Sequence, residues 1–396
     1  MAKEDNNTDN SIVIGHKHTL YSEILGEDRP YWVHLPYSHN DPPHAPQKYP
    51  VVYLLDGDTD FHPFTGVTTF MGRGNNYNFQ IPEFIVVAIP NTDRVRDLTP
   101  THTTVEFNGT DNPFLETSGG GDAFLRFIEE ELFPEIASTY PVQDYRVLVG
   151  HSFGGLLTLH ALLTKPDMFH AHLAVDPSCW WDKETLKRQA QQLLTAKTAL
   201  KGNVYISLAY SFYDGVDDPD DPELNTTTMR AFVDVLTSFE SPEFQLKFQY
   251  FNDEDHVSVP LLSWYYGFLY LFQGYKIDTD ISKGSTYLKE HFDYWSNKLG
   301  IPRKPLEWHV NEAGLYFLHT AQDIDKALEF LTMNVANNPH SYNAHHRLAE
   351  AYEASGDNEL AIAHYKKALS LNPDLQDVHN QLHQLQKSLP GDTKKG

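Results

Sequence analysis

The 396-residue chain contains a single cysteine, Cys179, no uninterrupted apolar run that approaches 18 residues, and few basic side chains. One cysteine excludes an internal disulfide framework and fits a reducing compartment. The lack of a long apolar run predicts that no segment spans a membrane. Only 30 Lys and Arg stand against 54 Asp and Glu, which gives a net charge of −24. So negative a surface repels phosphate backbones and argues against nucleic acid as a partner.

The first ten residues are polar and lack both the apolar core of a signal peptide and a lipid-anchor motif. We expect residues 1–10 to form a disordered tail and the protein to be cytoplasmic, with no membrane partner. Hydrophobic residues make up 40% of the chain, which excludes a wholly disordered or fibrous protein. The length predicts two or three domains.

Short apolar runs alternate with longer helical patterns between residues 11 and 277. Most of these runs are apolar on both faces, as expected for strands buried between two helical layers. They occupy residues 51–55, 84–89, 147–149, 173–175, 204–208 and 244–251. This alternation predicts an α/β domain with a doubly wound, mostly parallel sheet over residues 11–277.

The C-terminal part of the chain is helical and repetitive. Residues 278–304 are predicted to be a helical linker, residues 305–388 a small all-α domain, and residues 389–396 a tail. Pro339 and Pro373 lie 34 residues apart, and each follows an asparagine.

Residues 341–373 closely resemble one tetratricopeptide repeat, because they carry small and aromatic residues at its packing positions and a glycine in its turn. The matching residues are Leu348, Ala349, Tyr352, Gly356, Ala361, Tyr365, Ala368 and Pro373. Residues 307–339 look like a degenerate first copy and residues 375–387 like a capping helix. Such repeats imply a protein or peptide partner. The alternative is an ordinary helical hairpin with accidental periodicity.

Residues 150–154 read Gly-His-Ser-Phe-Gly, between a short strand and a helix. In this context, a G-x-S-x-G pattern indicates a tight strand-to-helix turn that exposes its serine as a nucleophile. Glycines are expected at both ends because side chains there would clash. The Phe153 N–H would face the developing oxyanion at the helix N-terminus. The alternative is a glycine-rich junction without catalysis.

A serine hydroxyl needs a base to remove its proton. In hydrolases that carry this type of serine turn, the catalytic histidine follows the last strand of the sheet. His256 occupies that position in this chain. The acid is expected after the strand at 204–208, where Asp214 is the first acid available. Asp214 as a solvated turn residue, and a Ser–His dyad without an acid, stay open as alternatives.

Further segments fit a pocket for acyl transfer. The Asp58 amide follows a strand ending at Leu55 and is the candidate for the second oxyanion donor. Arg94 and Arg96 follow the next strand at the same edge, and arginine forks bind carboxylates, catecholates and phosphates. The alternative is that either arginine pairs with Asp93 or Asp97 as a structural clamp.

Trp180 is a candidate wall of the substrate pocket, although paired tryptophans are more often core residues. The closely spaced histidines of the chain lack the helical spacing and the acidic neighbours of a zinc site. We therefore expect neither a metal site nor another cofactor.

Five segments together resemble the α/β-hydrolase esterases that include the enterobactin- and bacillibactin-type siderophore esterases. They are residues 54–58, 89–100, 150–155, 176–181 and 255–262. The resemblance spans about residues 11–275, and the repeats look like the extension of some bacterial members.

By this resemblance Ser152 is the nucleophile and His256 the base, and the amides of Asp58 and Phe153 form the oxyanion hole. Relatives commonly have a glutamate in the loop after the strand at 204–208, where this chain has Tyr210 to Tyr213. Asp176 stands where relatives often have a serine, and no chemical consequence follows from the sequence.

The resemblance implies a serine esterase that forms an acyl-enzyme on Ser152 and cleaves a siderophore trilactone or short acyl esters. An acyltransferase that uses the same site is one alternative. A scaffold that binds proteins through its repeats and carries a vestigial hydrolase domain is another.

Overall fold

The computed structural model describes residues 11–40, 48–73, 79–106, 109–211, 224–277, 280–300 and 302–388. Contacts divide the chain into two compact units, Met1–Lys276 and Ile277–Gly396. Among the described residues, no helix has the length and apolar character needed to cross a membrane.

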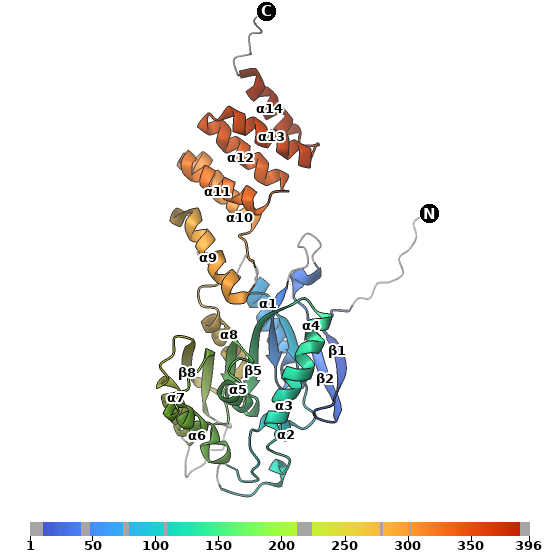
Figure 1. Ribbon diagram of the computed structural model, residues 1–396, viewed down its shortest axis with the longest axis vertical. Helices are drawn as coiled ribbons and strands as arrows, with labels where there is room; N and C mark the ends of the chain where they lie inside the picture. The colour runs from blue at the N-terminus through green and yellow to red at the C-terminus, as the bar shows by residue number, and fades with distance from the viewer. Residues whose placement is uncertain are drawn as a thin grey trace, which may run out of the picture. The chain divides into compact units, whose positions relative to one another are not determined.

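The first unit is built on an eight-stranded sheet in the order β1-β2-β4-β3-β5-β6-β7-β8 (Figure 1). Its strands are β1 (His16–Ser22), β2 (Glu27–His34), β3 (Tyr49–Leu54), β4 (Ile85–Ala88), β5 (Val142–His151), β6 (Ala171–Val175), β7 (Gly202–Ser211) and β8 (Phe244–Asp255). β1 and β2 pair antiparallel at one edge, and all pairs from β4 to β8 are parallel. The prediction of a mostly parallel α/β sheet is confirmed.

Helices cover both faces of this sheet. α1 (Gly57–Arg73) packs against α8 (Val259–Leu271) on one face (Figure 1). A continuous layer on the other face contains α2 (Arg94–Leu98), α3 (Gly121–Phe127), α4 (Phe133–Thr139), α5 (Phe153–Thr164), α6 (Trp181–Thr195) and α7 (Leu224–Thr237). A π-helical turn, Ile128–Leu132, joins α3 to α4.

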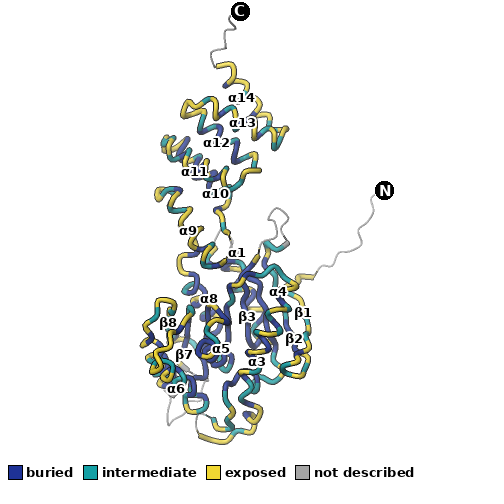
Figure 2. Tube along the Cα trace, in the orientation of Figure 1, coloured by how far each residue is buried: buried dark blue, intermediate teal, exposed yellow. Residues whose placement is uncertain are grey.

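The core lies along the central strands, which Figure 2 shows as buried. Every residue of β3, β4 and β6 is buried. This two-sided burial explains why these strands are continuous apolar runs rather than alternating ones. The carboxyl ends of the parallel strands therefore carry the polar residues that the chain can present to a ligand.

The second unit is a series of helices. They are α9 (Gly284–Leu299), α10 (Glu307–Leu315), α11 (Ile324–Asn337), α12 (Tyr342–Ser355), α13 (Asn358–Leu371) and α14 (Gln376–Ser388). The first of them, α9, lies in the segment predicted as a helical linker. Ala361, Tyr365 and Ala368 of α13 are fully buried with Ala349 of α12. Gly356 ends α12 in the left-handed region at φ +82°, which glycine adopts without strain. The residues that indicated a repeat thus form its helix–helix contact.

Candidate active site

Ser152 alone separates β5 from α5, and its backbone has φ 59° and ψ −116°. A residue with a side chain rarely adopts this conformation, and strain of this kind concentrates at functional sites. A Cβ on Gly150 would collide with the backbone of Gly154, and one on Gly155 would lie 2.8 Å from the Pro177 side chain. The glycines therefore let the turn close as tightly as the sequence motif predicted.

The turn is tied to the end of the neighbouring strand, β6. The Ser152 N–H donates to the Val175 carbonyl at 3.0 Å, and the Ser178 N–H donates to the Ser152 carbonyl at 3.2 Å. The hydroxyl oxygens of Ser152 and Ser178 lie 3.5 Å apart. Residues 175–178 therefore form one wall around the serine.

The carboxylate of Asp176 lies at this wall and contacts the candidate base. Its Oδ2 is 2.6 Å from Nδ1 of His256. Both residues are buried, at 1% and 6% exposure. A buried carboxylate that accepts from Nδ1–H selects the imidazole tautomer in which Nε2 carries no proton and can accept one, and it stabilises the imidazolium.

Sequence reasoning gave Asp176 no role and selected Asp214, which lies outside the described residues. The available signal was the position of Asp176 directly after β6, at the same sheet edge as Ser152. The deciding contact joins residues 80 positions apart.

A second histidine packs beside His256. The ring of His151 lies with its centroid 4.5 Å from that of His256. Burial and the neighbouring His256 lower the pKa of His151 to about 3. His151 is therefore neutral near pH 7 and supports the His256 ring by packing. Asp255 shapes the same loop by accepting from the backbone amides of Val257 and Ser258.

The two expected oxyanion donors lie at helix N-termini. Phe153 begins α5, and Asp58 is the second residue of α1. Amides in a first helical turn have no acceptor within their own helix and are available to a ligand. A Cβ on Gly57 would lie 2.8 Å from the Ala88 side chain, so the turn after β3 needs glycine for its close approach to β4.

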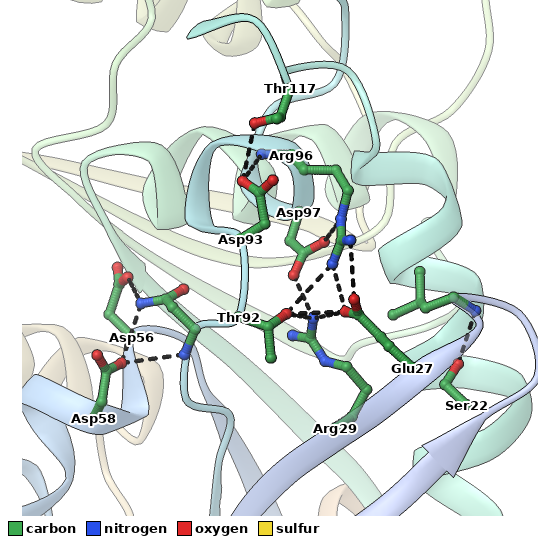
Figure 3. A network of polar contacts seen from close by, with 12 residues as sticks. Ser22, Glu27, Arg29, Asp56, Asp58, Thr92, Asp93, Arg96, Asp97 and Thr117 are labelled. Atoms are coloured by element: carbon green, nitrogen blue, oxygen red, sulfur yellow. Dashed lines mark hydrogen bonds and ion pairs between the residues drawn. The ribbon is translucent and has the colours of Figure 1, made fainter. Parts of the chain in front are cut away.

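Both arginines selected from the sequence bind carboxylates of the chain itself. Nε and Nη2 of Arg94 donate to the two oxygens of Asp56 at 2.7 and 3.0 Å. Arg96 donates to Asp97 and to Glu27, and the Arg96 hydrogen bond is the main cause that lowers the pKa of Glu27 to about 2 (Figure 3). The pairing of Arg96 with Asp97 is the structural ion pair that the sequence offered as the alternative to substrate binding.

Trp180 and Trp181 differ in burial. Trp181 is fully buried, and its indole N–H lies 3.3 Å from the Thr101 carbonyl, so it belongs to the core. Trp180 is half-buried, and its ring centroid lies 6.2 Å from that of Phe153. Trp180 therefore lies near the serine turn, and its role as a wall of the substrate pocket stays a prediction. Within the described ranges, no group of three or more His, Cys, Asp or Glu side chains is arranged to hold a metal ion.

Comparison with known proteins gives the family. Residues 22–259 match the family model described as a putative esterase. The chain belongs to this esterase family. It is an enzyme that hydrolyses carboxylic esters, and residues 342–375 of this esterase match the tetratricopeptide repeat. The resemblance inferred from the sequence is confirmed in both parts.

Several relatives are similar to most of the esterase unit. The ferri-bacillibactin esterase BesA of Bacillus subtilis is 30% identical over 260 residues, which are 64% of this chain and 88% of the relative. The siderophore enterobactin esterase of Emericella nidulans is 34% identical over 174 residues, which are 41% of this chain and 56% of the relative. An IroE-like serine hydrolase from Shewanella oneidensis has a TM-score of 0.69 and 29% identity, and the match covers 82% of this chain and 99% of that one.

Proposed function

We propose that Ser152, His256 and Asp176 are the catalytic triad of this esterase. The hydrogen bond between Asp176 and His256, beside the strained serine turn, is the observation that carries the proposal. Asp176 takes the role for which the sequence suggested Asp214. The amides of Asp58 and Phe153 are the proposed oxyanion hole.

The reaction proceeds through an acyl-enzyme. His256 Nε2 removes the Ser152 proton while Ser152 Oγ attacks the ester carbonyl carbon, and the carbonyl electrons move to the oxyanion. The oxyanion collapses, the ester C–O bond breaks, and His256 protonates the departing alcohol. Water, deprotonated by His256, then releases the acid from Ser152.

An alcohol in place of water would turn the same steps into acyl transfer. Product analysis with an added alcohol decides between the two reactions. Free acid as the dominant product supports hydrolysis, and a dominant new ester supports the transferase.

The substrate that we propose is a siderophore ester. BesA, which is similar over most of its length, is named for ferri-bacillibactin, and the relative from E. nidulans is named for enterobactin. The chain carries a net charge of −24, and Arg94 and Arg96 are both paired with carboxylates. A polyanionic ferric catecholate would be repelled, so we propose the iron-free ester as the preferred form.

Hydrolysis of iron-free and ferric bacillibactin and of p-nitrophenyl butyrate, followed by chromatography, tests this assignment. We expect kcat/KM to be highest for the iron-free siderophore, and Ser152→Ala to abolish all three activities. A butyrate ester hydrolysed faster than either siderophore form would contradict the siderophore assignment while leaving the esterase intact.

We infer further that the repeats bind a protein or peptide partner and that the enzyme acts in the cytoplasm. The match to a tetratricopeptide repeat supports the first point, and the single, buried Cys179 supports the second. A photo-crosslinking residue in place of Tyr342, which is exposed on α12, tests the partner. A crosslinked adduct that is lost on competition with the isolated partner supports the inference, and its absence contradicts it.

A further inference from the structure

Arg94 connects three segments that surround the serine turn. It begins α2, directly after β4, and bonds through two donors to Asp56, which follows β3. Its Nη2 also donates to the carbonyl of His151, the last residue of β5, at 3.3 Å. The guanidinium carbon lies 5.4 Å from the centre of the Phe153 ring. One side chain thus contacts the turns that carry both proposed oxyanion amides.

Asp56, which lies in the turn after β3, is the residue through which Arg94 contacts that turn. Asp56 is buried and has φ +53°, a conformation unusual for a residue with a side chain. Its carboxylate also lies close to Gly154, because a Cβ there would be 3.2 Å from Oδ2. The Asn91 side chain donates to the carboxylates of both Asp56 and Asp58, at 2.8 and 3.1 Å. The strained turn is therefore held by charged and polar contacts from the segment after β4.

We propose that Arg94 is a positioning residue that acts through Asp56 and fixes the Asp58 amide against the Phe153 amide. The inference rests on the proposed oxyanion hole and gives Arg94 a role other than binding an anionic substrate. A bidentate arginine–carboxylate pair suits this task because both its direction and its distance are fixed. Small displacements of preorganised donors weaken transition-state stabilisation strongly.

Arg94 is well suited to this role electrostatically. Burial opposes its charge, but the hydrogen bonds and charge of Asp56 outweigh that effect and raise the pKa of Arg94. The guanidinium is therefore charged throughout the working range of the enzyme. An anionic substrate would have to compete with Asp56 for the same fork.

Arg146 offers a control with the same kinds of contact, although its carboxylate partner is exposed, on the strand that leads to the serine turn. It donates to the Asp144 carboxylate at 2.6 Å and to the Met168 carbonyl at 3.0 Å, and it lies 4.8 Å from the Phe133 ring centre. These are the same three kinds of contact that Arg94 makes. None of the three partners belongs to the proposed oxyanion turns.

The test compares Arg94→Met, Arg94→Lys, Arg94→Ala and Arg146→Met on the full chain, with the neutral substrate p-nitrophenyl butyrate. We expect Arg94→Met to lower kcat about 100-fold, as loss of an oxyanion donor does, with KM changed less than about threefold. Arg94→Lys should recover part of kcat, and guanidinium ion should partly rescue Arg94→Ala. Arg146→Met should lower the melting temperature but keep kcat within about twofold.

Three results would overturn the inference. A raised KM with unchanged kcat in Arg94→Met would make Arg94 a substrate ligand, and equal losses of kcat in Arg94→Met and Arg146→Met would make it merely structural. If Arg94→Met does not fold, Asp56→Asn supplies the same comparison because it retains size and loses charge. Labelling of Ser152 by a fluorophosphonate in the same preparations keeps the two proposals apart. If the fluorophosphonate does not label Ser152 in the wild-type enzyme, the proposed triad is wrong. If Ser152 is labelled but Arg94→Met is fully active, which is the third result, only the positioning role of Arg94 is wrong.

Discussion

Asp176 and His256 are 80 positions apart in the chain and share a buried hydrogen bond of 2.6 Å between Oδ2 and Nδ1. The proposed acid therefore follows β6, the strand that pairs with the strand leading to Ser152. With Asp176 as the acid, the proposed triad needs no residue from the segment after β7. We therefore predict that the reaction needs the carboxylate of Asp176.

Asp176→Asn should lower kcat by about 10²–10⁴-fold, because the amide does not hold the reactive tautomer of His256 or stabilise its charged form. KM for a small neutral ester should change little. Steady-state kinetics with p-nitrophenyl butyrate measures both constants, and circular dichroism checks that the variant is folded.

Asp214→Asn is the companion measurement for the acid. We expect its loss of kcat to be far smaller than that of Asp176→Asn. An Asp214→Asn enzyme that is equally or more impaired would show that the segment after β7 provides the acid.

Asp60 lies in the first turn of α1, close to Asp56. We predict that its charged form destabilises the folded protein at high pH. Burial, followed by the charge of Asp56, raises the pKa of Asp60 to about 6. The folded state therefore binds this proton more tightly than the unfolded state. The contribution of this proton to the free energy of unfolding is fully present below pH 3.8 and is lost as the pH rises through 6.

Asp60→Asn should raise the free energy of unfolding at pH 8 by up to about 3 kcal/mol relative to its effect at pH 3.5. Urea unfolding at both pH values measures this difference. Glu116→Gln, at an exposed position, is the control. An Asp60→Asn effect that is the same at both pH values would contradict the shifted pKa.

For His172 we predict a contribution to the free energy of unfolding with the opposite pH dependence to that of Asp60. It is fully buried in β6, and burial lowers its pKa to about 3. The unfolded state takes up the proton near pH 6.5, so the stability is present above that pH and is lost as the pH falls towards 3. At pH 5 the loss from this residue is about 2 kcal/mol.

His172→Leu should remove that part of the acid sensitivity. The difference in free energy of unfolding between pH 7.5 and pH 5 should shrink by about 2 kcal/mol relative to wild type. The exposed residue His62 supplies the control variant His62→Gln. If His172→Leu and wild type lose stability in parallel on acidification, His172 is not the buried neutral group described.

The parts of the fold predicted from the sequence are those that local pattern determines. β3, β4 and β6 are apolar throughout because both sheet faces are covered, and the serine turn is marked by glycines that its geometry requires. A repeat of 34 residues with small residues at its packing positions likewise predicts its own helix pair.

The parts that were missed depend on contacts between distant segments. A π-helical turn, Ile128–Leu132, separates α3 from α4 just before Pro134, which has no N–H to donate. The partner of Arg94 is Asp56, 38 positions earlier, and the partner of His256 is Asp176. Only the alignment of strands in the sheet brings such pairs together, and the local sequence does not encode it.

We propose that the hydroxyl of Ser152 is the activated nucleophile of this esterase. Reaction of the full chain with a fluorophosphonate, followed by mass spectrometry of the peptide containing residue 152, tests it most directly. We expect one covalent adduct on Ser152, formed in step with the loss of esterase activity and absent from Ser152→Ala. Ester hydrolysis that survives in Ser152→Ala, or wild-type protein that stays unlabelled while active, would contradict it.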